Sequence, residues 1–248
     1  MGLPIKTTKK SKPKDLAIGI FGFSGLGKST LSGTVPVKRD EDVLYIDIEK
    51  GLEVLRDRDF QAIEFDEVTS YEHDGKMIKL DKPSSRIKYI LDMIIKEDIK
   101  YEWIIMDSFT ELAERIKEHM EQNPKTYDLL TSKGAFDGLK MYGEIRKVYR
   151  AIILKFLSMK GNKVAIFGAE EKNNSIEVMM DGSFKKRVMF QFDEFWGLKA
   201  TPEGRQLVID SDGTYVAKSR MNGGSGGKLS TYEKPDIKYI LEKCYAET

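Results

Sequence analysis

A short segment near the amino terminus has residue types and spacing that could bind phosphates. Residues 22–29 read Gly-Phe-Ser-Gly-Leu-Gly-Lys-Ser and fit the pattern G-x-x-x-x-G-K-[ST] at each fixed position. The glycines let the backbone curl with its N–H groups pointing inward at a phosphate chain, and the next helix adds partial positive charge. We therefore predict a P-loop that binds Mg-ATP, with Lys28 reaching the β- and γ-phosphates as a catalytic group and Ser29 ligating Mg²⁺. The residues expected to contact the nucleotide are Gly22, Phe23, Ser24, Gly25, Leu26, Gly27, Lys28, Ser29 and Thr30.

A magnesium site of this kind also needs a carboxylate, expected at the carboxyl end of a neighbouring buried strand. Asp107 follows the apolar run 101–106 and is the candidate metal ligand, with Ser108 beside it to orient water. The alternative is that Asp107 only caps the helix that follows.

Hydrolysis requires a group that activates or positions water near the γ-phosphate. Asp47 and Glu49 lie at the end of the β-branched run 43–48, and strand alternation places them on the same side. Glu49 is nearer the carboxyl end and is the candidate catalytic carboxylate. The spacing leaves open that it is an ordinary charge at a strand end.

Two cations near the end of a late strand, Lys218 and Arg220, could stabilise charge on a γ-phosphate, in the same chain or from a neighbouring subunit. A solvated strand end is the alternative, which composition alone favours. The basic run 185–187 lies among Phe184, Phe190 and Phe192, a pattern that can bind single-stranded nucleic acid. A charged hairpin with buried phenylalanines explains it equally well.

The elements that must position these residues alternate between strands and helices, as a parallel α/β sheet requires. After residue 170 the pattern changes to short alternating runs that predict two antiparallel hairpins, 175–180 with 184–192 and 205–210 with 214–220. The expected strands are 16–21, 43–48, 62–65, 101–106 and 164–167, and the expected helices are 27–33, 84–98, 109–120, 138–159 and 235–245. Long loops are expected at 121–135 and 223–227.

Composition limits the remaining possibilities. A chain of 248 residues suits one α/β domain, which we place at 15–248 behind a basic flexible leader at 1–14. The net charge of +1 excludes a global attraction to nucleic acid or anionic lipid. A single cysteine excludes an internal disulfide and fits the cytoplasm, and the absence of a long apolar run argues against a membrane partner.

The segments GFSGLGKST, YIDIEKGLEVL, WIIMDSFTEL, FQFDEFWGL and RQLVIDSDGTYVAKSRMNG occur in this order across residues 16–223. With them the chain resembles RecA-like ATPases, and more narrowly the compact phage nucleotide-binding proteins of the Sak single-strand-annealing type. The resemblance implies a RecA-like P-loop NTPase core and ATP hydrolysis coupled to single-stranded DNA in recombination or annealing. It further implies homo-oligomeric rings or filaments, a single-strand-binding protein as partner, and the host cytoplasm as location.

The same resemblance assigns Glu49 as catalytic carboxylate and Asp107 as the Mg²⁺-linked acid, and matches Lys218 and Arg220 to the Lys-x-Arg of ring helicases. It places DNA-facing loops at about 121–137 and 171–187. One departure is Glu170, which stands where RecA proteins have a glutamine that senses the γ-phosphate. An ionised carboxylate cannot donate a hydrogen bond to phosphate.

Other functions remain open at this stage. A small ring-forming DNA helicase or helicase accessory shares the AKSRMNG ending. An ATP-controlled binding switch with slow turnover would use the same P-loop. A metabolite kinase fits less well, since no cluster of several arginines predicts a lid.

Overall fold

The computed structural model describes residues 15–98, 100–180, 185–224 and 227–245, so the predicted leader lies outside the described residues. Within them the chain forms a 10-stranded mixed sheet in the order β12-β10-β9-β1-β7-β6-β2-β3, with β11 beside β9 and β8 beside β7. The strands are β1 (Ala17–Gly22), β2 (Val43–Asp47), β3 (Gln61–Glu64), β6 (Trp103–Asp107), β7 (Asn162–Lys172), β8 (Ser175–Val178), β9 (Glu194–Thr201), β10 (Gly204–Val208), β11 (Lys218–Ser219) and β12 (Tyr232–Glu233).

In the run β9-β1-β7-β6-β2-β3, each strand is parallel to the next one in the run. Strands β1, β2 and β6 are buried throughout, which explains why their sequences are continuous apolar runs. Because the strands are parallel, the residues that follow β1, β2 and β6 meet at one edge of the sheet.

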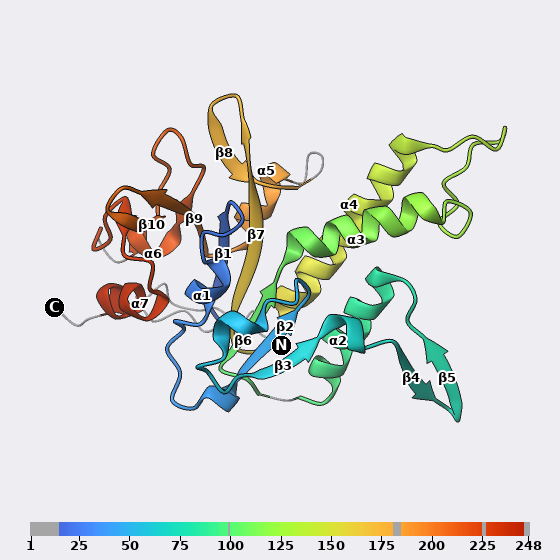
Figure 1. Ribbon diagram of the computed structural model, residues 1–248, viewed down its shortest axis with the longest axis horizontal. Helices are drawn as coiled ribbons and strands as arrows, with labels where there is room; N and C mark the ends of the chain where they lie inside the picture. Colours follow the sequence, from blue (N-terminus) through green and yellow to red (C-terminus); the bar gives the residue numbers. More distant parts are fainter. Residues whose placement is uncertain (1–14, 99, 181–184, 225–226, 246–248) are drawn as a thin grey trace, which may run out of the picture.

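Helices cover both faces of the sheet (Figure 1). Leu31 of α1 (Lys28–Ser32) and Ile240 of α7 (Ile237–Tyr245) pack on one face. The other face is covered by α2 (Pro83–Lys96), α3 (Phe109–Gln122) and α4 (Gly138–Ser158). The predicted class, an α/β fold with a mainly parallel sheet and helices on both faces, is confirmed.

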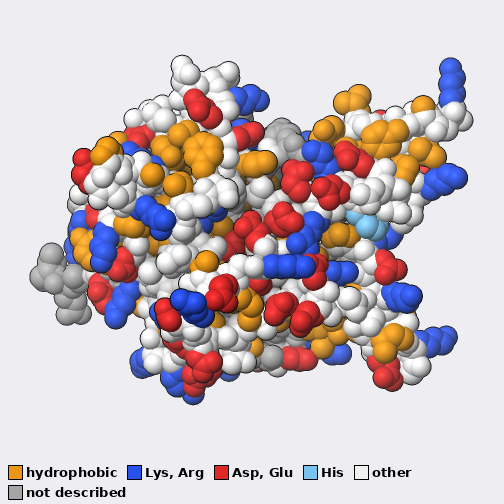
Figure 2. Space-filling view, in the orientation of Figure 1, with side chains coloured by type: hydrophobic (Ala, Val, Ile, Leu, Met, Phe, Trp, Pro, Cys, Tyr) orange, Lys and Arg blue, Asp and Glu red, His pale blue; other side chains and the backbone are white. Residues whose placement is uncertain are grey.

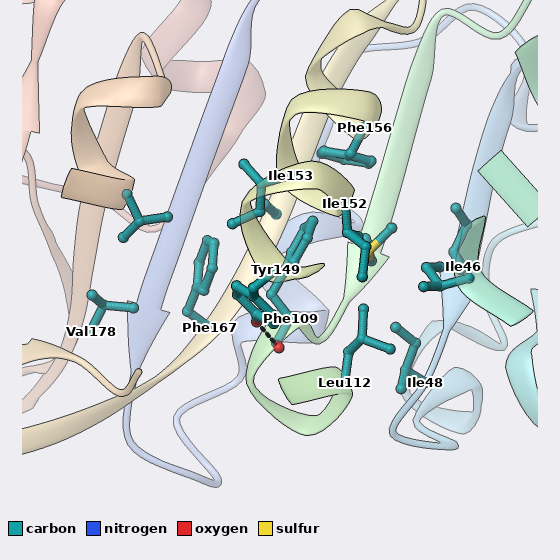
Figure 3. Close-up of a cluster of buried hydrophobic side chains, with 14 of the residues drawn as sticks. Ile46, Ile48, Phe109, Leu112, Tyr149, Ile152, Ile153, Phe156, Phe167 and Val178 are labelled. Atoms are coloured by element: carbon teal, nitrogen blue, oxygen red, sulfur yellow. Dashed lines mark hydrogen bonds between the residues drawn. The ribbon is translucent and has the colours of Figure 1, made fainter. Parts of the chain in front are cut away.

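An aromatic cluster fixes the start of α3, directly after Asp107 (Figure 3). The Phe109 ring stacks on Phe167 of β7 with 5.3 Å between centroids and meets Phe156 of α4 edge to face at 5.4 Å. The Tyr149 hydroxyl donates a hydrogen bond to the Phe109 carbonyl oxygen. The end of β6 is therefore held from both the sheet and the helix layer.

The first predicted hairpin, 175–180 with 184–192, is wrong. Strand β8 pairs antiparallel with β7, and the turn between them is Asn173-Asn174, both with positive φ (49° and 61°). Asparagine tolerates this left-handed backbone, which suits a tight hairpin turn. The later residues form helical turns instead, α5 (Lys185–Val188) and the 3₁₀ turn Met189–Gln191.

The second predicted hairpin, 205–210 with 214–220, is also wrong. Strands β10 and β11 both pair with β9, not with each other. Four strands were not predicted: β9, β12, and the pair β4 (Ser70–His73) and β5 (Lys76–Lys79), which form a hairpin around Asp74 and Gly75. The glycine-rich segment 223–227 begins inside α6 (Arg220–Gly224), and residues 225–226 lie outside the described residues. No helix in the described part of the chain is long and apolar enough to cross a membrane.

Candidate functional site

The predicted P-loop joins β1 to α1 in the expected strand–turn–helix context. Gly25 and Gly27 have φ values of 76° and 86°, a backbone region that L side chains rarely adopt. Gly27 is the N-cap of α1, and its carbonyl accepts from the Leu31 amide at 2.9 Å. The turn therefore leads directly into a helix N-terminus, with the predicted nucleotide contacts from Gly22 to Thr30 along it.

The Lys28 side chain folds back over this turn. Its Nζ donates to the Phe23 carbonyl oxygen at 3.1 Å, so the ammonium lies across the loop. Burial lowers the pKa of Lys28, while the carboxylates of Glu49 and Asp107 oppose this shift. The ammonium thus faces the two acidic groups predicted for the same site.

Ser29 and Asp107 are in direct contact, although they are far apart in the sequence. The Ser29 hydroxyl donates to Asp107 Oδ2 at 2.5 Å, and the buried Tyr45 hydroxyl donates to the same oxygen at 2.5 Å. Burial raises the pKa of Asp107 to about 6. Strand pairing places Asp107 level with Asp47, at the carboxyl ends of β6 and β2.

The surroundings of Asp107 fit Mg²⁺. Its Oδ1 is buried and has no hydrogen-bond partner among the described residues. A buried polar oxygen without a partner is unusual and calls for an explanation such as an ion. A carboxylate oxygen beside a serine hydroxyl offers the oxygen ligands that Mg²⁺ takes, with nucleotide phosphates completing its shell. Ser29 and Asp107 are therefore the residues that would hold the metal.

The alternative role for Asp107, capping α3, is wrong. Ser108 is the N-cap, and its Oγ accepts from the Glu111 amide at 3.2 Å. The Ser108 hydroxyl also donates a hydrogen bond to Glu49 Oε1. Ser108 therefore caps the helix and orients the candidate catalytic carboxylate, while Asp107 is left for the site.

Glu49 and Asp47 have different surroundings. Asp47 is buried and accepts from the Gly51 amide at 3.1 Å, which closes the turn after β2. Glu49 lies beyond the strand, exposed, and its amide donates to the Asp107 carbonyl oxygen at 3.3 Å. The carboxylate held by Ser108 is thus the one positioned next to Lys28.

Lys218 and Arg220 are not part of this cluster within one chain. Lys218 pairs with Phe195, which is level with Gly19 of β1. Along the strand direction Lys218 therefore lies about 10 Å from Gly22, and it is also two strands away from β1. Its Nζ donates to the Phe192 carbonyl oxygen at 2.6 Å, on the side away from the P-loop. Arg220 binds Asp193 at 3.0 Å. Their catalytic role stays a prediction.

The basic, aromatic segment is largely used inside the fold. Lys185 binds Glu170, the residue at the expected sensor position, and also Glu177 at 2.8 Å. Phe192 is buried in the core, whereas Phe190 is 59% exposed. Phe184 lies outside the described residues.

Sequence reasoning missed Tyr45 as part of the site. Tyr45 lies in the middle of the apolar run that forms β2 and is fully buried. A buried tyrosine hydroxyl usually has a hydrogen-bond partner. A tyrosine inside an apolar run could therefore have indicated a polar group nearby.

Comparison with known proteins identifies the family. A family model described as an AAA domain matches residues 14–221. The chain belongs to this AAA domain family. The matched range includes the P-loop and both candidate carboxylates, Glu49 and Asp107. Together with the geometry of these residues, the family match identifies the chain as a nucleotide-binding P-loop ATPase. No curated protein matches the chain. The crystal structure of a KaiC-like protein from the hyperthermophilic archaeon Pyrococcus horikoshii OT3 is similar, with a TM-score of 0.47, 13% identity and 80% coverage of each chain.

Proposed function

We propose that this chain is a Mg²⁺-dependent ATP hydrolase that acts on single-stranded DNA in phage recombination or annealing. The observation that carries the ATPase part is the convergence of Lys28, Ser29, Asp107 and Glu49 at one edge of the sheet. The DNA part rests on the sequence resemblance and on the exposed side chains described below.

Each group in the cluster has a distinct task in hydrolysis. The Lys28 ammonium binds the β- and γ-phosphate oxygens, and the P-loop amides bind the phosphate chain. Glu49 accepts a proton from the attacking water or orients that water, and the Ser108 hydroxyl fixes the carboxylate for this task. Mg²⁺, when held by Ser29 and Asp107, neutralises phosphate charge.

The positions of Lys218 and Arg220 support a head-to-tail homo-oligomer, a ring or a filament. In one chain these cations lie toward the amino end of β9, while the P-loop lies at the carboxyl end of β1. Their own P-loop is therefore out of reach, and a neighbouring copy stacked in the same direction would receive them. Such a cation contributes roughly 10³-fold or more to phosphoryl transfer.

The arm formed by α3 and α4 supports the DNA proposal. The two helices lie side by side and project away from the sheet (Figure 1). Phe136, Leu139 and Tyr142, at the start of α4, are 46%, 89% and 45% exposed. Exposed aromatic rings give stacking platforms for unpaired bases, and nearby lysines contact phosphates. Acidic and basic side chains are interspersed over the face in Figure 2, so local contacts of this kind would have to supply the binding.

The test is ATP hydrolysis measured with and without single-stranded DNA, alongside a Lys28→Ala variant. We expect DNA to stimulate turnover and the variant to lose it, because the Lys28 ammonium is the cation of the P-loop that binds the β- and γ-phosphate oxygens. Normal hydrolysis by the variant would rule out the P-loop mechanism.

Two other results would redirect the proposal. Strand displacement would identify a helicase or helicase accessory. Tight nucleotide binding without turnover, with or without DNA, would identify an ATP-controlled switch. Annealing assays with an added single-strand-binding protein would then test the proposed partner.

A further inference from the structure

An arginine from a distant strand lies directly over the P-loop. A Cβ atom built on Gly27 would come within 2.5 Å of Arg205 Nη1 and 3.2 Å of its Cζ. Arg205 belongs to β10, where it pairs with Ala200 of β9. A guanidinium from a strand remote in the sequence therefore lies next to the backbone of Gly27, the N-cap of α1.

No contact within the described part of the chain explains this position of the Arg205 side chain. The residue is exposed, and no hydrogen bond or ion pair of its side chain occurs among the described residues. By contrast, Lys199 on the neighbouring strand contacts Asp212 at 3.4 Å. The guanidinium therefore has N–H donors available beside the turn whose backbone amides are expected to bind the phosphates.

The order of the strands tells which part of the nucleotide Arg205 would meet. Asp107 ends β6 and Glu49 follows β2, and both strands lie on one side of β1 in the sheet. Strand β10 lies on the other side of β1, beyond β9. The metal-binding and catalytic groups mark the γ-phosphate end, so Arg205 approaches from the opposite, nucleoside end.

The position of Thr30 supports the approach of Arg205 from the nucleoside end of the nucleotide. Its Oγ1 lies 3.8 Å from the same Cβ position on Gly27, so Arg205 and Thr30 flank one side of the turn. Thr30 follows Ser29, the candidate metal ligand, and therefore lies one residue farther along α1 from the expected position of the γ-phosphate. A nucleotide bound with its γ-phosphate toward Asp107 and Glu49 would therefore place the phosphate joined to the ribose nearest to this side.

We propose that Arg205 binds the α-phosphate of the nucleotide, as a positioning residue that holds the part of the molecule that is not transferred. This rests on the ATP binding proposed above. A free guanidinium presents several N–H donors in a planar fork that matches phosphate oxygens. ATP and ADP both carry an α-phosphate, so the contact contributes equally to substrate and product binding.

The experiment compares nucleotide affinities of the wild type and Arg205→Ala by isothermal titration with ATP and with ADP in the presence of Mg²⁺. We expect affinity for both nucleotides to fall by a similar factor, roughly tenfold to a hundredfold, as for a lost hydrogen bond to a charged group. Arg205→Lys, which keeps the charge, should recover part of the loss. Arg150→Ala removes an exposed arginine from α4, on the other face of the sheet, and should change neither affinity.

The outcomes separate this inference from the proposed function. A wild-type protein that binds no nucleotide would overturn both. Unchanged affinities for Arg205→Ala, with a wild type that binds, would overturn only the role of Arg205. A loss confined to ATP would place Arg205 at the γ-phosphate and contradict the proposal. A loss that varies strongly between ATP and GTP, without rescue by lysine, would show stacking on the base instead.

Melting temperatures provide a second readout. Arg205 makes no side-chain hydrogen bond or ion pair with the residues that the structure describes, so without nucleotide the variant should melt at the wild-type temperature. The upward shift that nucleotide produces in the wild type should be reduced in the variant, since weaker binding gives less stabilisation. A lower melting temperature without nucleotide, with an unchanged shift, would indicate a purely structural role and contradict the inference.

Discussion

Asp107 is held in surroundings that disfavour its charge. Burial raises its pKa to about 6, although Ser29 and Tyr45 both donate hydrogen bonds to Oδ2. Its other oxygen has no partner among the described residues. These surroundings fit the Mg²⁺ that we propose to bind with the nucleotide, because without a cation the ionised Asp107 carboxylate is buried at an unfavourable free-energy cost.

This arrangement predicts an unusual pH dependence of stability without metal. The folded carboxyl group keeps its proton up to about pH 6, whereas the unfolded one loses it near an ordinary pKa of 3.8. Raising the pH through this window therefore favours the unfolded chain. Between about pH 5 and pH 7.5 the contribution of Asp107 to the free energy of unfolding should fall by about 1.4 kcal/mol.

Urea unfolding in the presence of a chelator measures this effect. Relative to wild type, Asp107→Asn should gain about 1.4 kcal/mol between the two pH values, because its side chain does not ionise. Asp57→Asn removes an exposed carboxylate and should follow the wild-type profile. Parallel pH profiles for wild type and Asp107→Asn would show that the carboxyl group titrates normally.

Among the individual site residues, the sequence predicted those that are marked by a pattern of neighbouring residues. The P-loop was recognisable because its glycines, lysine and serine are consecutive, and Asp107 because it follows a buried strand. The hydrogen bonds from Tyr45 to Asp107 and from Ser108 to Glu49 join residues 62 and 59 positions apart. Such pairings depend on which strands are neighbours, and a single sequence does not specify that.

Strand β9 organises the part of the sheet that was predicted incorrectly. It pairs with β1 on one side and with β10 and β11 on the other. Three of the four alternating runs contain an antiparallel strand, β8, β10 or β11, and the run 184–192 forms helical turns instead. Each of the three strands pairs with β7 or β9, whereas the prediction paired it with the nearest run along the chain. Because β9 is buried at its start, its sequence lacks the alternation that marks a half-exposed strand.

The contact of β1 with β9 depends on a glycine. A Cβ atom on Gly19 would lie 2.3 Å from Cδ2 of the Phe195 ring, which is fully packed in the core. Gly19→Ala should therefore lower the free energy of unfolding by about 1–3 kcal/mol through overpacking. Urea unfolding tests this.

Gly143 on α4 provides the matched control, because a Cβ there would meet nothing within 4 Å. Gly143→Ala should leave stability unchanged or raise it by up to about 1 kcal/mol, since alanine favours the helix. Equal effects of the two substitutions would contradict the packing argument at Gly19.

For the whole molecule, the important feature is the separation of the P-loop from Lys218 and Arg220. If a neighbour supplies these cations, mixing two inactive variants should restore activity. Lys28→Ala damages only the P-loop and Lys218→Ala only the donated cation, so some interfaces in a mixture combine an intact P-loop with an intact lysine. Random mixing of equal amounts makes about a quarter of the interfaces competent.

The measurement is ATP turnover of each variant alone and of the mixture, with nucleotide binding by Lys218→Ala checked separately. Lys218→Ala should still bind ATP, because its side chain is remote from the P-loop in its own chain. A mixture no more active than its components would exclude the shared site. Size-exclusion chromatography with a non-hydrolysable ATP analogue shows whether the copies associate.

The distance between the P-loop and the two cations within one chain also affects how many complete catalytic sites an oligomer would contain. In the proposed head-to-tail oligomer, each junction between copies would have a donor end and an acceptor end, so a row of copies would have two unlike termini. In an open row the last acceptor has no donor, and the number of working junctions is always one fewer than the number of copies. A closed ring has no such deficit. Turnover per copy should therefore climb with the length of a filament toward a plateau, whereas a ring would reach its full rate in one step when it closes.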